Sequence, residues 1–404
     1  MPAGEGAGWD RPTLGVVLAG FCAFLGFYVP QPLLPMLARL FGVSHVAVSL
    51  TITVATAGVA IAAPLIGLVA DRFGRKRVIV TSAILLAFAT LGAATANTLR
   101  PLLVWRFLQG ICTPGVFAVT VAYIQEEWAG RGAGSATAAY VTGTVIGGFT
   151  GRFSSGLVAT HWNWHLSFVT AGVIGLAAAV LLWRWLPQER RFVRRADEHS
   201  TLASASDHVR NRRLIATFAA GFCVLFSLLG VFTYITFYLA APPFHLLPAG
   251  LGSLFFVYLI GAVITPVCGR QIDRYGHRLS LAAAVGVSIA GVLLTLSQTL
   301  WIVIAGLALC CTGVFVAQSA ANSYIGVATT HSKALAVGMY VTFYYAGGSA
   351  GAVLPGYLWG RYGWPGCAAL FVAVQLTTVA IALAWWTAPG GEEDREVVES
   401  ITPA

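Results

Sequence analysis

The chain has 404 residues, of which 57% are hydrophobic and only 10% are charged, and its mean hydropathy is +0.78. Soluble domains carry about 25% charged residues, so this composition excludes a water-soluble globular protein and indicates a membrane protein. The net charge of +9 requires no nucleic-acid partner, because the basic residues lie in short loops without the interleaved aromatic residues that stack on bases.

Apolar stretches of about 20 residues, each long enough to cross a hydrocarbon core of roughly 30 Å as a helix, are separated by short polar segments. The first half of the chain predicts spans at 14–36, 46–68, 78–97, 101–124, 133–159 and 164–186. The second half predicts spans at 214–240, 250–269, 279–297, 300–326, 334–358 and 364–387. No cleavage pattern of a signal peptide accompanies the first span, so we expect it to be a retained helix.

The positions of Lys and Arg predict the orientation of these spans. Most of these residues fall in loops on one side of the membrane, and by the positive-inside rule this side, with both termini, is cytoplasmic. Residues 187–213 are polar, basic and poor in apolar side chains, as a linker would be. The predicted parts are an N-terminal lobe at 1–186, a cytoplasmic linker at 187–213, a C-terminal lobe at 214–387 and an acidic cytoplasmic tail at 388–404.

Two segments of the first half recur in the second half. The segment GLVADRFGRKR, which begins at Gly67, recurs as GRQIDRYGHR and aligns Asp71 with Asp273. The segment GGFTGRFSSG recurs as GGSAGAVLPG at 347–356. An internal duplication near half the chain length predicts two six-helix lobes related by pseudo-symmetry.

Twelve spans in two repeated sets of six, with DRFGRK between spans two and three, resemble the major facilitator superfamily of secondary transporters. The resemblance implies an all-α membrane protein with twelve transmembrane helices in two pseudo-symmetric six-helix lobes. It also implies a conformational gate in the repeated loop. The gate residues would be Gly67, Asp71, Arg72, Gly74, Arg75, Lys76, Asp273 and Arg274.

Two further motifs narrow the resemblance. RFLQG on span four, with Arg106, Gln109 and Gly110, resembles a motif of proton-coupled members. GTVIGG on span five resembles the motif of drug:proton antiporters, although Thr144 stands where that motif usually has proline. Together with QPLLPMLARLFGVS, YLAAPPF and YYAGGSAG, these motifs are most similar to the YnfM-like, acriflavine-sensitivity branch of bacterial efflux proteins. The resemblance implies a multi-pass protein of the bacterial inner membrane, which we expect to be a monomer.

Arg106 and Arg152 are predicted inside spans four and five, where a charge in hydrocarbon costs at least about 2.5–3.5 kcal/mol. Charges inside the membrane are functional candidates by default, but both arginines are also close enough to the outer ends to reach the interface by snorkelling.

None of the fifteen acidic residues is predicted in the middle of a span. A central cavity would therefore be neutral to positive, and neutral or anionic substrates fit it as well as cationic ones. Proton coupling would use Glu126, Glu127 or Asp71 near the cytoplasmic face, or Arg106 acting electrostatically on them. Alternatively, Glu126 and Glu127 are a solvated pair at the end of a helix.

Glycines at spacings of three and four residues recur on spans five and eleven. Small residues at this spacing let a neighbouring helix approach closely, which suits any tightly packed membrane helix. Their repetition in both halves favours helices at the interface of the lobes, where one lobe rocks against the other. These glycines are Gly143, Gly147, Gly148, Gly151, Gly347, Gly348 and Gly351.

Polar and aromatic residues on several spans are candidates for substrate contacts, because an aromatic-lined pocket suits varied amphipathic ligands. Aromatic residues also form belts at the membrane interface, so part of this set is expected to face lipid instead. The candidates are Phe24, Tyr28, Gln31, Gln109, Arg152, Tyr234, Tyr238, Gln318, Asn322 and Tyr344.

The leading interpretation of function is secondary export of small amphipathic or drug-like compounds by alternating access, in exchange for protons. Arg106 and Arg152 equally suit uptake of a small organic anion or metabolite, and a lipid flippase on the same fold stays open. A membrane-embedded enzyme is disfavoured, because no nucleophiles, carboxylates or metal ligands converge at one depth. No CxxC pair and no GxxxxGK phosphate loop occurs, so we expect no metal, no cofactor and no ATP hydrolysis.

The resemblance also implies a partner for the repeated aspartate. Asp71 would lie beside the inner start of span eleven, in THSKALAVG, with Arg75 close by, and the positive end of that helix would favour the carboxylate. Asp273 would lie beside the start of span five. We interpret the loop as a latch between the lobes, formed when the cytoplasmic side closes and broken when it opens.

Overall fold

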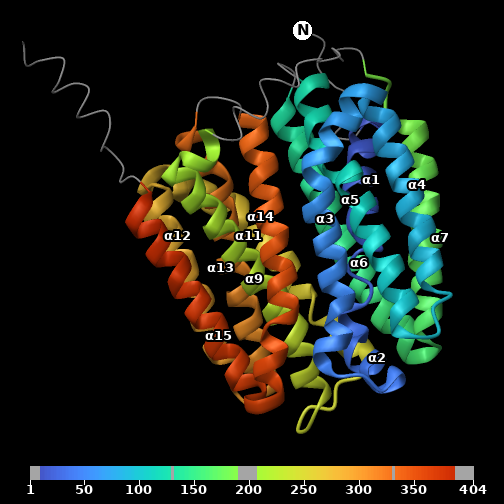
Figure 1. The fold of residues 1–404 in the computed structure, drawn as a ribbon, viewed down its shortest axis with the longest axis vertical. Helices are drawn as coiled ribbons and strands as arrows, with labels where there is room; N and C mark the ends of the chain where they lie inside the picture. The colour runs from blue at the N-terminus through green and yellow to red at the C-terminus, as the bar shows by residue number, and fades with distance from the viewer. Residues whose placement is uncertain (1–9, 129–131, 190–206, 330–332, 387–404) are drawn as a thin grey trace, which may run out of the picture.

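The structure is a computed structural model, and it describes residues 10–128, 132–189, 207–329 and 333–386. Within these ranges the chain is helical and contains no strand. The helices form two bundles that stand side by side, one from each half of the chain (Figure 1). The predicted fold class, an all-α membrane protein with two six-helix lobes, is confirmed.

The first transmembrane segment is broken, whereas a continuous span was predicted at 14–36. Helix α1 covers Arg11–Leu25, and after a turn the chain continues as a 3-10 helix, η1 (Gln31–Leu33), and as α2 (Leu34–Phe41). The turn contains Pro30 and η1 contains Pro32, and proline removes a helical donor and clashes with the preceding turn. The break leaves backbone carbonyls at the end of α1 without helical donors.

The other helices of the N-terminal lobe match the predicted spans to within a few residues at each end. They are α3 (His45–Phe73), α4 (Arg75–Ala93), α5 (Leu99–Glu127), α6 (Ala133–His161) and α7 (Trp164–Trp185).

The C-terminal lobe departs from the prediction in two places. The span predicted at 250–269 is divided between a short helix and a longer one, and the span predicted at 334–358 ends at Val353. The last helix begins at Pro355 and bends at Gly363, where φ is +60°. The helices are α9 (Arg212–Ala240), α10 (Pro248–Ser253), α11 (Phe256–Tyr275), α12 (His277–Leu294), α13 (Leu300–Ala328), α14 (Lys333–Val353) and α15 (Pro355–Trp385).

Membrane-spanning character is distributed over both lobes. Eight described helices are long and apolar enough to cross a membrane, namely α3, α4, α5, α7, α9, α12, α13 and α15. Helix α1 and the segment Pro248–Gly261 are shorter apolar helices. Helices α6 and α14, which are rich in small and polar residues, complete the twelve segments.

The two copies of the repeated loop share the same backbone conformation at their glycine. Gly74 joins α3 to α4 with φ +93°, and Gly276 joins α11 to α12 with φ +79°. Side chains other than hydrogen are strained at such φ values, so the glycine of the repeated loop allows one helix to follow another after a single residue. Trp164 and Trp364, which the repeat aligns, are both buried.

We call the end of the molecule where α3 meets α4 the Asp71 end, and the opposite end, where α2 meets α3, the His45 end. Of the predicted linker, only 187–189 and 207–213 are among the described residues. The predicted acidic tail at 388–404 lies outside them.

Candidate functional site

The two lobes are bonded to each other in the half of the molecule toward the His45 end. Thr56 of α3 and Ser349 of α14 place their hydroxyl oxygens 2.8 Å apart, and Thr53 donates to the Ser349 carbonyl at 3.3 Å. Nearer that end, Tyr234 of α9 donates to the Ser49 hydroxyl at 3.3 Å. These bonds connect α3 of the first lobe to two helices of the second.

A second contact between the lobes joins α6 to α10. Gly156 lies so close to the carbonyl of Pro248 that a Cβ at this position would overlap it. The amide of Ala249 donates to Thr160 Oγ1 at 2.8 Å. Because backbone meets backbone here, the two lobes close the His45 end.

The same pair of helices, α3 and α14, separates toward the Asp71 end. A Cβ built on Gly67 of α3 or on Gly338 of α14 would have no atom of another segment within 4 Å. Next to Gly67, the side chains of Leu65 and Leu68 are 58% and 51% exposed. The lobes are therefore joined at the His45 end and parted at the Asp71 end.

A cavity of about 180 Å³ lies between the lobes. Both lobes contribute aromatic rings and aliphatic side chains to its walls, and no Asp or Glu of the described residues lines it. Five of the predicted contact residues line this cavity: Phe24, Tyr28, Arg152, Gln318 and Tyr344. Gly148 also lines it.

The other five predicted contact residues do not line the cavity. Gln31 is fully buried and accepts a hydrogen bond from Arg152. Tyr234 is fully buried in the contact between the lobes, and Tyr238 donates to the Ser297 carbonyl at 3.1 Å. Asn322 is exposed outside the cavity lining, and Gln109 is buried beside Arg106. Residue type and helical spacing do not say which face of a membrane helix meets the cavity.

Sequence reasoning missed several wall residues. Thr144, Tyr258 and Phe315 line the cavity together with the predicted residues. Thr144 stands where the drug:proton antiporter motif usually has proline, and this departure was the only signal pointing to it. The others resemble the many aromatic residues that face lipid, so their sequence carries no distinguishing mark.

Arg152 lies in the cavity wall and is 2% exposed. Its Nε donates to Gln31 Oε1 and its Nη1 donates to the Gly148 carbonyl, both at 2.8 Å. Its guanidinium carbon lies 3.7 Å from the centre of the Tyr28 ring and 4.8 Å from that of Tyr258. Arg152 is therefore buried between the lobes, and snorkelling to the interface is ruled out.

Arg106 is fully buried but does not line the cavity. Its Nε donates to the Thr51 carbonyl at 2.9 Å, and its two Nη atoms donate to the carbonyls of Gly26 and Phe27 and to Gln109 Oε1. The helical donor for the Gly26 carbonyl would be residue 30, a proline without an amide hydrogen. Arg106 thus satisfies the carbonyls that the break after α1 exposes.

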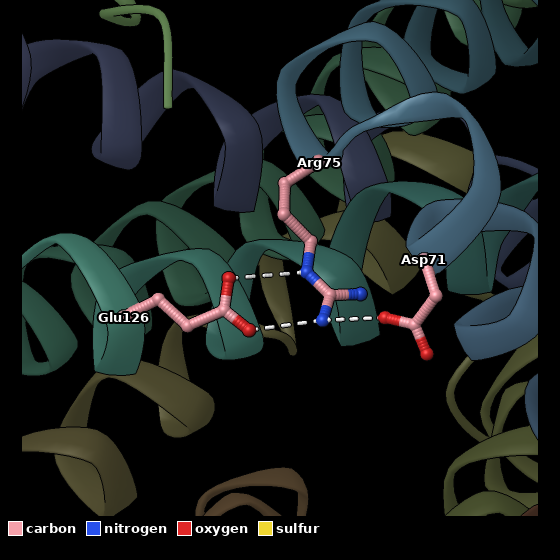
Figure 2. Close-up of polar contacts among 3 residues, drawn as sticks. All are labelled: Asp71, Arg75 and Glu126. Carbon is pink, nitrogen blue, oxygen red and sulfur yellow. Dashed lines mark hydrogen bonds and ion pairs between the residues drawn. The ribbon is translucent and has the colours of Figure 1, made fainter. Parts of the chain in front are cut away.

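The predicted gate loop contains a cluster of three charges at the Asp71 end (Figure 2). Arg75 Nη2 lies 2.7 Å from Asp71 Oδ1 and 2.9 Å from Glu126 Oε1, and Arg75 Nε donates to Glu126 Oε2 at 3.2 Å. One guanidinium is therefore shared by two carboxylates, from α3 and from α5. The start of span eleven, which the resemblance implies as the partner of Asp71, falls partly in residues 330–332, outside the described chain.

A further acidic residue, not predicted as part of the gate, lies against the start of α4. The backbone amide of Lys76 donates to Glu189 Oε2 at 3.4 Å, and Glu189 also packs on Gly74. A carboxylate at the first turn of a helix interacts favourably with its dipole. Glu189 follows α7, so the end of the first lobe is tied to the gate loop.

The remaining gate residues are less informative. Arg72 and Arg274 are exposed, each with its guanidinium over the ring of the following residue at 5.7 Å and 5.3 Å. The side chain of Asp273 lies outside the described atoms. Glu127, at the end of α5, has an interaction partner of its own.

Most of the repeated glycines pack against the first helix of their own lobe, although α6 and α14, which carry them, also contact the other lobe, as the contacts of Gly156 and Ser349 show. A Cβ on Gly147 would overlap the carbonyl of Phe21 in α1, and a Cβ on Gly347 would overlap that of Phe222 in α9. The first helix of each lobe is therefore held against its fifth helix by backbone contact. Gly143, Gly151 and Gly351 make the same kind of contact with Val17, Leu25 and Phe226.

Gly147→Ala is expected to lower the melting temperature of the purified protein, whereas Gly148→Ala leaves it nearly unchanged. At Gly147 the new methyl group meets the backbone of Phe21, which cannot move without displacing α1. At Gly148 the three nearest atoms belong to side chains, the closest being Arg152 Nη1 at 3.1 Å, so the backbone of the first helix need not move. Equal melting temperatures for the two variants would contradict the assigned packing.

Comparison with known proteins agrees with this architecture. The sequence profile of the Major Facilitator Superfamily matches residues 16–246 and 239–402. The MFS-type transporter YybF of Bacillus subtilis is 34% identical over 93% of this chain and 91% of its own length. The inner membrane transport protein YnfM of Escherichia coli is 34% identical over 91% of this chain and 88% of its own length.

Solved structures share the fold at low identity. A variant of the nucleoside transporter NupG superposes with a TM-score of 0.76 at 15% identity, covering 93% of this chain and all of that one. The xylose transporter XylE from E. coli, in a partially occluded inward-open conformation, gives a TM-score of 0.74 at 14% identity over 95% of this chain and 98% of its own. The chain therefore belongs to the Major Facilitator Superfamily and is a multi-pass membrane transporter rather than an enzyme.

Proposed function

We propose that this chain exports small amphipathic compounds by alternating access, in exchange for protons. The observation that carries the proposal is the cavity between the lobes. The lobes are joined at the His45 end and parted at the Asp71 end, so the cavity is closed off from one side only. Its walls are aromatic and aliphatic with few polar groups, which suits compounds with an apolar body. Rocking of the lobes would open the His45 end and close the Asp71 end.

We assign the Asp71 end to the cytoplasm. The cations of the gate loop lie there, and short cytoplasmic loops carry an excess of Lys and Arg. With this assignment both termini lie in the cytoplasm, and the parted end faces the inside, where it would take up a compound for export.

The charge cluster is our candidate for proton coupling. Asp71 and Glu126 together carry one more negative charge than Arg75 compensates, and a proton on either carboxylate removes that excess. Arg106 is not part of this step, because it lies about 30 Å from Glu126 along α5 at 1.5 Å per residue. At this distance Arg106 is too far from the acidic residues to act on them electrostatically.

Transport into proteoliposomes tests the proposal. A panel of labelled neutral, cationic and anionic amphipathic compounds is offered with and without a pH gradient, with the orientation of the protein determined by protease access. We expect the labelled compounds to move toward the side of the membrane that the His45 end faces. Their transport should be faster when that side is acidic. Accumulation of the compounds on the other side would contradict export. If Glu126 couples transport to protons, the transport rate of the double variant Glu126→Gln/Glu127→Gln should not depend on the pH gradient.

A second function is supported by one observation. Arg152 places a buried positive charge in the cavity wall, which favours an organic anion as the transported compound, in either direction. The direction in which labelled anions accumulate in vesicles separates uptake from export.

Asp71→Asn is expected to lower the transport rate while expression and membrane insertion persist. The change removes one of the two carboxylates around Arg75 and alters the interaction that we propose for the closed Asp71 end. Initial rates in proteoliposomes, normalised to the amount of protein, give the measurement. Unchanged transport would reduce the loop to a signal for orientation.

A further inference from the structure

We propose that the cavity binds the carboxylate of its substrate between Arg152, Gln31 and Tyr258, a group that we call the carboxylate site. This inference rests on the proposed function only in taking the cavity as the substrate-binding region. It adds a charge and a functional group to the class of compound transported.

The carboxylate site contains hydrogen-bond donors that the protein does not use. Gln31 does not line the cavity itself but lies directly behind Arg152, whose Nε donates to Gln31 Oε1, and its fully buried Nε2 has no hydrogen-bond partner among the described residues. The hydroxyl of Tyr258, a residue that is 8% exposed, is buried and has none either among the described residues. Buried polar atoms in proteins are almost always hydrogen-bonded, so two orphaned groups beside one guanidinium indicate a missing acceptor.

The charge of the site points to the same ligand. No carboxylate of the described residues lines the cavity, and Arg152 faces the rings of Tyr28, Phe255 and Tyr258 at 3.7 to 4.8 Å instead. Aromatic rings attract a cation but compensate a buried charge less fully than an anion does. A carboxylate would supply both the negative charge and acceptors for several donors.

The apolar walls define the rest of the ligand. Phe24, Phe315 and Tyr345 border the same cavity, whose volume of about 180 Å³ suits a single aromatic or short aliphatic body. The compound class is therefore a small monocarboxylate with an apolar body.

The carboxylate site is also divided between the lobes. Gln31 and Arg152 belong to the first lobe, whereas Phe255 and Tyr258 belong to the second. A bound carboxylate would contact both lobes while the His45 end is closed, and opening of that end would withdraw Tyr258 from it. Release of the anion would then accompany the transition.

Arg106 provides the contrast within the same lobe. It is as buried as Arg152, but its guanidinium donates to three backbone carbonyls and to Gln109. Its donors are thus used for the structure of the protein, and it lies outside the cavity lining.

Binding of matched probes to the purified full-length protein tests the inference. Benzoate and 3-phenylpropanoate are compared with benzamide and 3-phenylpropanamide, which have nearly the same shape without the charge, by calorimetry and by thermal shift. We expect each carboxylate to bind about ten- to hundredfold more tightly than its amide. Equal affinities, or no binding of either carboxylate at millimolar concentration, would overturn the proposal.

Three variants identify the site. Arg152→Gln should abolish the preference for carboxylates, and Gln31→Glu should do the same by giving Arg152 an internal carboxylate. Tyr258→Phe removes only an unpartnered hydroxyl, so it should fold normally and weaken carboxylate binding severalfold without changing amide binding. Arg39→Gln, at an exposed position of α2, is the control and should keep the preference. Retention of the preference in both Arg152→Gln and Gln31→Glu would refute the assigned residues.

Transport separates this inference from the proposed function. If the protein binds carboxylates as predicted but moves no compound of the panel, export is refuted and the carboxylate site stands. If it exports neutral compounds and shows no preference for carboxylates in binding or transport, the carboxylate site is refuted and export stands.

Discussion

Joining α3 to α14 by a disulfide, through the double variant Thr56→Cys/Ser349→Cys, should abolish transport, and reduction should restore it. The two hydroxyl oxygens lie 2.8 Å apart, so thiols at these positions come within the range that a disulfide requires. The bond would hold the lobes together toward the His45 end, and alternating access requires them to part there. The expected loss is complete, because every cycle passes through that opening.

Single variants separate the cross-link from the substitutions themselves. Thr56→Cys and Ser349→Cys alone should transport at similar rates with and without oxidant, because the cysteines among the described residues are buried, apart from the half-buried Cys112, and so are poorly accessible to oxidant. The cross-link is followed by mass spectrometry of peptides before and after reduction. A fully cross-linked protein that still transports would show that this contact does not open during the cycle, and alternating access around it would have to be abandoned.

The sequence predicts the fold because its strongest signals are local. Composition and the length of the apolar stretches define the twelve segments, and most ends agree with the helices to within a few residues. The Asp71 and Asp273 repeat predicts the two lobes, and the glycines that follow these residues adopt the same unusual backbone conformation. Properties of a single segment, such as its length and its turn conformation, can therefore be predicted from the sequence.

Contacts between segments are harder to predict from the sequence. Prolines interrupt the first span, but the apolar run around them is long enough to look continuous, and a single span was predicted. Gly147 and Gly347 signal a close approach of helices, but not that the neighbour is the first helix of the same lobe. The partner of a small residue is decided by tertiary packing, which spacing alone does not encode.

The candidate site divides in the same way. Arg152 stands out in the sequence because a charge inside a span is rare, and the structure places it in the cavity. Tyr258, from the other lobe, carries no such signal, since an aromatic residue on a membrane helix is ordinary. The sequence thus predicts the part of the carboxylate site that the first lobe contributes. The part that the second lobe contributes depends on how the two lobes pack together.

Replacement of Arg106 by leucine should destabilise the protein more than any other single change discussed, and transport should be lost with the fold. The Gly26 and Phe27 carbonyls receive no helical donor, since residue 30 is proline and the amide of Gln31 donates to Tyr28 instead. Each buried carbonyl left without a donor costs about 1–3 kcal/mol. Two of them remove a large part of the stability of an ordinary domain, which is about 5–15 kcal/mol.

The measurement is the melting temperature of the purified protein, with the yield of folded protein on size-exclusion chromatography. Arg106→Lys should have a melting temperature between those of the unaltered protein and Arg106→Leu. A single ammonium group cannot donate to all the carbonyls that the planar guanidinium reaches. Arg100→Leu, at an exposed position of the same helix, is the control and should melt close to the unaltered protein. If Arg106→Leu melts normally but transports nothing, the guanidinium acts in the transport cycle itself, and the role of a cap for the broken first helix is refuted.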